Sequence, residues 1–153
     1  MAEGPPADAG AGFVHLHRVR IYYEDTDSSG LVYHANYLRF AERARTEMLR
    51  EFGFVHPALL AGDGVAFVVR HLAADFRAPA RLDDLVAVET RVKSQHGASL
   101  DLLQDITRDG IDLVQLKVKL ACITPDGRPT RVPAALRAAF GRLIDNSSGR
   151  SDG

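Results

Sequence analysis

The chain has 153 residues, a formal net charge of −1 and 46% hydrophobic residues, values typical of one globular domain with a substantial core. The small net charge argues against a nucleic-acid-binding or membrane-surface protein, and no apolar run approaches the ~20 residues that span a bilayer. The amino-terminal stretch lacks the features of a secretory signal, and Cys122 is the only cysteine, which excludes an intramolecular disulfide. We therefore expect a cytoplasmic protein.

Both ends of the chain have the composition of tails. Residues 1–12 are rich in Gly, Pro and Ala, and residues 145–153 are mostly polar. Such segments bury too little apolar surface to fold, so we expect both to be disordered. The folded domain is expected to cover residues 13–144.

A strand followed by a long helix is expected in the first third of the domain. Residues 14–23 alternate in the manner of a strand, and the acidic, Ser/Gly-rich segment 24–30 predicts a turn. The apolar residues that follow recur at spacings of three and four, which predicts one buried helix face: Tyr37, Phe40, Ala41, Ala44, Met48 and Phe52. Asn36, or the residue before it, is the expected N-cap, and Gly53 fits the position after the last turn. The amino end of this helix, where backbone N–H groups lack partners, is therefore expected to gather polar side chains.

Strands are expected to dominate the rest of the chain. A short helical turn or loop at 56–62 precedes an extended segment, 65–76, whose apolar run 65–69 fits an inner strand covered on both faces. Three alternating segments follow at about 86–93, 100–106 and 114–122, and Asp109-Gly110 is a strong hairpin signal. A terminal helix is expected at 134–143.

This order of elements predicts an α+β protein. An antiparallel sheet with one apolar face buries that face against the one long apolar helix. The expected architecture is a hot-dog fold, in which a five-stranded antiparallel sheet is wrapped around a long central helix. The edge strands of such a sheet need covering, and pairing with a second subunit is the simplest solution.

Three segments carry a resemblance to a known family. They are YYEDTDSSGLVYHANYLRFAERARTEMLR (22–50), VAFVVR (65–70) and APARLDD (78–84). They closely resemble the YbgC-type acyl-CoA thioesterases of the wider 4-hydroxybenzoyl-CoA thioesterase group, a branch associated with the bacterial Tol–Pal envelope system. The resemblance covers about residues 17–143 and implies a hot-dog fold, a homodimer or homotetramer, and hydrolysis of acyl-CoA without a metal. Ser28-Ser29 replaces the Ala/Gly pair often found in the family, which we expect to affect pocket shape more than chemistry.

The resemblance also implies the site. Asp27 matches the catalytic carboxylate and His34 the histidine at the start of the helix, whose backbone N–H would stabilise the oxyanion. Asp27 would act as a general base or as a nucleophile, and the sequence leaves both open. Gly30, Tyr33 and Asn36 are expected to contact substrate. No cofactor is expected, since coenzyme A is part of the substrate, and the histidines show no metal-ligand spacing.

Other interpretations stay open at this point. On turn chemistry alone, Asp27 is explained more simply as satisfying N–H groups of its own turn. A hot-dog scaffold that binds acyl carrier protein or envelope partners, with weak hydrolysis, is the alternative function. A hot-dog dehydratase would need acid–base residues inside the helix, whose polar residues we expect on its outer face. Candidate ligands for the coenzyme A phosphates are Arg70, Arg77, Arg81, Arg91, Lys93, Arg128 and Arg131. The preferred acyl group is not defined by the sequence.

Overall fold

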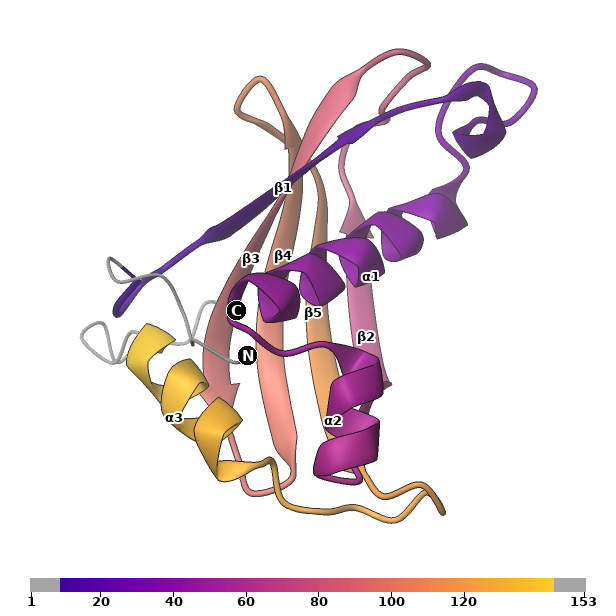
Figure 1. The fold of residues 1–153 in the computed structure, drawn as a ribbon. Coiled ribbons are helices and arrows are strands. Elements are labelled where there is room, and N and C mark those ends of the chain that lie inside the picture. Colours follow the sequence, from indigo (N-terminus) through magenta and orange to yellow (C-terminus); the bar gives the residue numbers. More distant parts are fainter. Residues whose placement is uncertain (1–8, 145–153) are drawn as a thin grey trace.

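The computed structural model describes residues 9–144, which form one α+β domain (Figure 1). In chain order the elements are β1 (His15–Arg20), a short 3-10 helix η1 (Tyr23–Asp25), α1 (His34–Glu51), α2 (His56–Gly62), β2 (Ala66–Phe76), β3 (Leu85–Gln95), β4 (Ser99–Arg108), β5 (Ile111–Ile123) and α3 (Ala134–Leu143). Within these residues no helix is both long and apolar enough to cross a membrane. Most of the two expected tails lies outside the described residues.

The five strands form one antiparallel sheet in the order β1-β3-β4-β5-β2. The hairpin between β4 and β5 turns at Asp109 and Gly110, which have φ angles of 52° and 79°. Positive φ at both central residues is what a tight hairpin turn requires, so the Asp-Gly prediction is confirmed. The predicted five-stranded sheet with one long helix is also confirmed.

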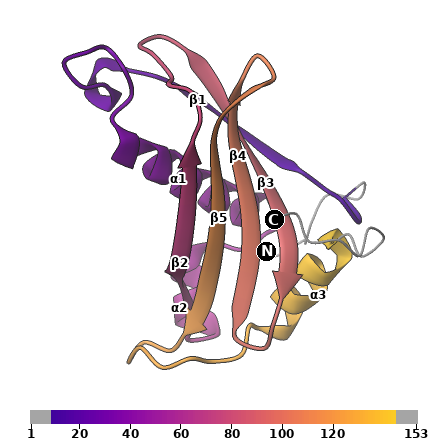
Figure 2. The same ribbon diagram turned by 180° about the vertical axis from the view of Figure 1, so that it is seen from behind.

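Helix α1 crosses one face of the sheet (Figure 1), whereas the view from behind shows strands with no helix of the described chain across them (Figure 2). The predicted apolar face of α1 is buried, and it approaches β1, β3 and β4. The strand residues beneath it alternate as expected, with Val86, Val88, Leu102 and Ile106 each at most 2% exposed. Burial of this shared face supplies the main driving force for the fold.

Strand β2 departs from the prediction, because it lies at the edge of the sheet and not inside it. It pairs only with β5, and Val68 and Val69 remain 41% and 45% exposed. A bulge between Val69 and His71 shifts the alternation, so that both halves of the strand keep apolar side chains on the helix side. The inner-strand interpretation of the apolar run is therefore wrong for the single chain.

The folded part begins earlier than the expected boundary at residue 13. Ala9 is buried, and the Gly12 N–H donates to the Leu143 carbonyl at 3.1 Å. The Phe13 ring lies 6.0 Å from that of Phe52, at the end of α1. Residues 9–12 therefore pack on the domain.

Candidate active site

The segment between β1 and α1 forms a tight turn that presents Asp27. The Asp27 N–H donates to the Leu31 carbonyl at 2.9 Å, and the Gly30 N–H donates to the Asp27 carbonyl at 3.1 Å. Gly30 has φ +81°, a conformation that only glycine adopts readily, so it closes the turn. An isolated β-bridge between Thr26 and Val32 holds the two sides of the turn together.

The Asp27 side chain is exposed and ionised. Its Oδ1 accepts a hydrogen bond from the Ser29 N–H at 2.8 Å and a short one from the Ser29 hydroxyl. These bonds stabilise the charged form and lower the pKa of Asp27 below its ordinary value. The carboxylate therefore accepts hydrogen bonds from its own turn, as turn chemistry alone predicts. It also remains exposed to solvent, where it can accept a second hydrogen-bond partner.

The N-cap of helix α1 lies three residues before Asn36, the predicted cap, and two before the alternative, Ala35. Tyr33 is the N-cap, with extended backbone angles, and offers no side-chain cap. Asn36 lies inside the first turn, where its Nδ2 donates to the Asp25 carbonyl at 2.8 Å. The N-cap prediction is wrong, because this amide ties the helix to the preceding turn through a tertiary contact.

The start of α1 leaves backbone donors available. Tyr33 N–H donates to Asp25 and Asn36 N–H to Tyr33, but no backbone acceptor among the described residues takes the N–H of His34 or Ala35. Unpaired N–H groups at a helix start favour developing negative charge. The His34 ring lies 4.6 Å from that of Tyr33 and 6.1 Å, edge on, from that of Phe76.

A cleft of about 410 Å³ brings these groups together. Asp27, Tyr33 and His34 line it from the loop and the start of α1. The other lining residues come from the same loop, from α1, and from the end of β2 with the segment after it, and none was proposed as an acyl-site residue: Leu31, Val32, Tyr37, Phe76, Arg77, Ala78 and Pro79. The volume is typical of a small-molecule site, about 300–1,000 Å³.

Tyr37 is the main polar group that the sequence did not reveal. It occupies the buried stripe of α1, and its Oη accepts a hydrogen bond from the Ala80 N–H at 2.9 Å. Burial raises the pKa of the phenol, so the O–H stays protonated and can donate into the cleft. A tyrosine at a core position of a helical pattern is indistinguishable from a packing residue.

The five predicted site residues divide into two groups. Asp27, His34 and Tyr33 line the cleft, whereas Gly30 and Asn36 hold the turn behind it. Arg77, one of the expected phosphate ligands, lines the cleft but donates to Asp75 at 2.9 Å. Among residues 9–144, no group of three or more His, Cys, Asp or Glu side chains could hold a metal ion.

The fold and the cleft together define a hot-dog protein with a carboxylate at the amino end of its central helix, and comparisons with known proteins specify its family. The thioesterase superfamily matches residues 29–115, a range that contains His34 and begins just after Asp27. The chain is 46% identical over 126 residues to the acyl-CoA thioesterase YbgC of Haemophilus influenzae, covering 82% of this chain and 93% of that protein. It is 45% identical over 124 residues to the acyl-CoA thioester hydrolase YbgC of Escherichia coli O157:H7, covering 80% and 92%.

The solved structures agree. The crystal structure of a probable thioesterase from Bartonella henselae superposes with a TM-score of 0.77 at 42% identity, covering 79% of this chain and 100% of that one. The chain therefore belongs to the thioesterase superfamily and, within it, to the YbgC acyl-CoA thioesterases. The resemblance found in the sequence is confirmed.

Proposed function

We propose that the protein hydrolyses acyl-CoA thioesters to free acid and coenzyme A, with Asp27 and the start of α1 as its catalytic elements. One observation carries the proposal: an ionised carboxylate and a helix start with unpaired N–H groups line the same cleft. Family membership supports the same reaction class.

In the general-base route, Asp27 takes a proton from water, and the hydroxide adds to the thioester carbonyl carbon. The carbonyl oxygen becomes an oxyanion, which the N–H groups of His34 and Ala35 stabilise; such a donor is worth ~3–4 kcal/mol of barrier. The C–S bond then breaks, and the thiolate of coenzyme A takes up a proton, for which the His34 imidazole is the candidate donor.

In the nucleophilic route, an Asp27 oxygen attacks the carbonyl directly. The C–S bond breaks to release coenzyme A, and water then hydrolyses the acyl–aspartyl anhydride. Single-turnover quenching separates the two routes. Coenzyme A appears before free acid if the anhydride accumulates, and the two products appear together in the general-base route.

The walls of the cleft favour a short-chain or aryl acyl group. Tyr33, Tyr37 and Phe76 present aromatic surface next to His34, and aromatic walls suit flat or short apolar groups. For the phosphates of coenzyme A, Arg91 and Arg128 are weaker candidates than expected. Each already pairs with a carboxylate, at 3.2 Å and 3.0 Å respectively.

We also propose that the protein assembles as a homodimer through the edge of β2, or as a homotetramer built from two such dimers. The strand has 11 residues, offers unpaired backbone groups on its free side, and keeps Val68, Val69 and Phe76 more than 40% exposed. A long apolar edge is normally covered, and a second copy would cover it. Light scattering after size exclusion measures the mass directly; a 16.7 kDa particle would contradict the assembly.

The reaction is tested by free-thiol release from a panel of CoA thioesters. Butanoyl-, hexanoyl-, palmitoyl- and benzoyl-CoA sample short, medium, long and aromatic acyl groups. We expect turnover above the spontaneous rate, with benzoyl- or the shorter acyl-CoAs preferred. Absence of turnover of every thioester by the folded oligomer would contradict hydrolysis and favour the alternative binding role.

A further inference from the structure

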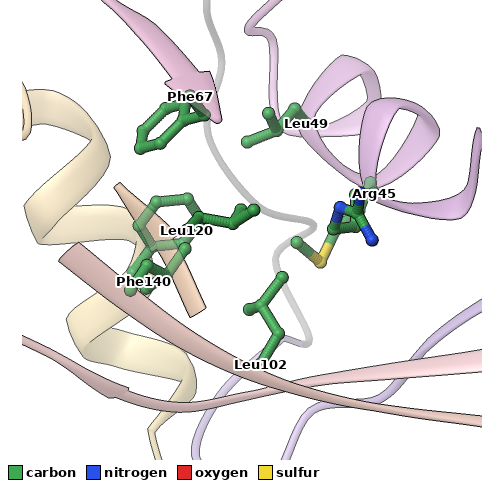
Figure 3. Close-up of a pocket in the computed structure, with 8 residues that line it drawn as sticks. Arg45, Leu49, Phe67, Leu102, Leu120 and Phe140 are labelled. Atoms are coloured by element: carbon green, nitrogen blue, oxygen red, sulfur yellow. The ribbon is translucent and has the colours of Figure 1, made fainter. Parts of the chain in front are cut away.

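The two halves of the candidate site have different supports. The start of α1 is fixed through the body of the helix, because Gln104 of β4 is fully buried beneath it. Gln104 Nε2 donates to the Ala41 carbonyl and to Thr90 Oγ1, both at 3.0 Å, and its Oε1 accepts from Arg45 at 3.0 Å. We expected the polar residues of this helix on its outer face, and for Arg45, which lies beside apolar side chains in Figure 3, that expectation is wrong.

The turn that carries Asp27 belongs to neither the helix nor the sheet. On one side Asn36 ties it to α1, through the Asp25 carbonyl. On the other side it lies against the segment between β2 and β3, residues 77–84. Two backbone hydrogen bonds and one isolated β-bridge make this second connection: Val32 N–H to the Ala80 carbonyl (3.0 Å), Leu82 N–H to the Gly30 carbonyl (3.3 Å), and Leu31 with Arg81.

Segment 77–84 contains the motif APARLDD, to which no function has yet been given, and its backbone is held in a defined shape. Asp83 has φ +71°, in the left-handed region that residues other than glycine rarely adopt. Its N–H donates to the Ile21 carbonyl at 3.0 Å, and its carbonyl accepts from Arg20 Nη1 at 2.7 Å. A strained residue persists only where its surroundings determine its conformation. The segment is therefore suited to hold a neighbouring turn in place.

Arg108, the last residue of β4, anchors this segment at two points. Its Nη1 donates to Asp84 Oδ2 at 2.7 Å and to the Pro79 carbonyl at 3.3 Å. Asp84 Oδ2 also accepts the Arg81 N–H at 2.8 Å. Arg108 thus joins the two ends of the stretch whose middle contacts the Asp27 turn.

The ion pair of Arg108 and Asp84 is partly withdrawn from solvent, with side chains 27% and 23% exposed. Burial alone would raise the pKa of Asp84. The hydrogen bonds from the Arg81 N–H and from Arg108, together with the charge of Arg108, outweigh it, so the pKa lies below its ordinary value. Both partners are therefore charged at neutral pH, and short charge-assisted bonds of this kind are the stronger ones in proteins.

We propose that Arg108 and Asp84 are positioning residues for the hydrolysis proposed above, on which this inference rests: through segment 77–84 they hold Asp27 in register with the start of α1. Neither side chain lines the cleft, so neither acts on the substrate directly. The register matters because a reacting group displaced by ~1 Å can cost about 10²-fold in rate.

Steady-state kinetics of Arg108→Met test the proposal. The substitution keeps an apolar stem and removes both contacts. We expect kcat to fall about 10- to 100-fold with KM within about threefold of the wild type, because the carboxylate is misplaced while the walls of the cleft remain. Arg108→Lys keeps a charged donor for Asp84 and should recover most of the loss. Asp84→Asn should also lower kcat, and adding it to Arg108→Met should cause little further loss, since the two residues act through one contact.

Two variants control for a general loss of stability. Lys119→Met breaks a comparable ion pair, that of Lys119 with Asp101 at 3.1 Å, whose side chains are 34% and 29% exposed. Asp101 precedes Arg108 by seven positions on β4, about 23 Å along the strand. Leu136→Val trims a fully buried residue of α3, a helix remote from the segment before α1 in Figure 1. Thermal unfolding should register both changes, and kcat should stay at the wild-type value.

Hydrogen exchange of the Val32 and Leu82 amides tests the same inference without any substrate. These two N–H groups make the bonds between the turn and segment 77–84. They should exchange at least about tenfold faster in Arg108→Met and at the wild-type rate in Lys119→Met. Unchanged exchange in Arg108→Met would overturn the inference even if the wild type hydrolysed no thioester, so its failure is distinct from that of the proposed function. An unchanged kcat in Arg108→Met, a change confined to KM, or an equal loss of kcat in Lys119→Met would also overturn it.

Discussion

The start and the middle of helix α1 use polar side chains in opposite ways. At the start, Asp27 and His34 face an open cleft, and the helix leaves N–H groups unpaired. In the middle, Gln104 and Thr90 are fully buried, and the amide donors of Gln104 are both used. The first arrangement keeps reactive groups available, whereas the second fixes the helix on the sheet. Substitutions at the start should therefore change activity with little change in stability, and those in the middle should do the reverse.

The largest effect on stability is expected for Gln104→Ala. The substitution removes a fully buried side chain and leaves Thr90 and Arg45 without their partner. We expect the free energy of unfolding to fall by about 3 kcal/mol, the sum of a cavity and unsatisfied polar groups. Denaturant unfolding measures it. Gln115→Ala is the control, since Gln115 is partly exposed and its bond to Asp105 should be worth no more than ~1 kcal/mol.

An equal loss of unfolding free energy in Gln104→Ala and Gln115→Ala would contradict the contrast between the start and the middle of α1. It would mean that the buried network under α1 contributes no more than a surface hydrogen bond.

Phe76→Ala is expected to have the next largest effect, on substrate binding. Phe76 is 48% exposed, and its ring lies near those of His34 and Tyr37. Loss of this wall should lower kcat/KM by about tenfold, since apolar pocket contacts are worth ~1–3 kcal/mol, mainly through a higher KM. Steady-state kinetics with the preferred thioester measure it. Ile111→Ala, at a similarly exposed residue away from the cleft, should leave the kinetics unchanged.

The smallest effect is expected for Ser29→Ala, in the pH dependence. Ser29 holds the pKa of Asp27 low through its hydroxyl and its N–H, and the variant loses the hydroxyl bond. The pKa of Asp27 should rise, so the acidic limb of the kcat/KM profile should move to higher pH. The plateau should stay within about twofold, as for most surface substitutions. Ser28→Ala is the matched control. If Ser29→Ala left the acidic limb unchanged, the limb would not report the ionisation of Asp27.

The sequence correctly predicted the structural features that depend on local residue patterns. Alternation and helical spacing identified the sheet and the buried face of α1, and Asp109-Gly110 identified its hairpin. The edge position of β2 was missed, because an apolar run indicates only that the strand is covered, and not whether the same chain covers it. Asn36 was misplaced because capping rules assign asparagine to the cap, whereas here its partner is a carbonyl in the preceding turn.

The candidate site divides in the same way. A long motif identified Asp27 and His34, which line one cleft in the structure. Tyr37 and Phe76 carry no such signal. Phe76 reaches the cleft only because β2 ends beside the start of α1. Contacts between distant segments follow from the assembled fold and leave no short-range pattern.

The catalytic role of Asp27 is tested most directly by kcat/KM for Asp27→Asn and Asp25→Asn in the same thiol-release assay. Asp25 lies in the same turn, and its carboxylate accepts the Tyr22 N–H at 2.8 Å, a bond that asparagine can keep. We expect Asp27→Asn to lose about 10²–10⁴-fold of the activity at unchanged stability, and Asp25→Asn to remain within a few-fold of the wild type. Wild-type activity in a folded Asp27→Asn variant would contradict the account.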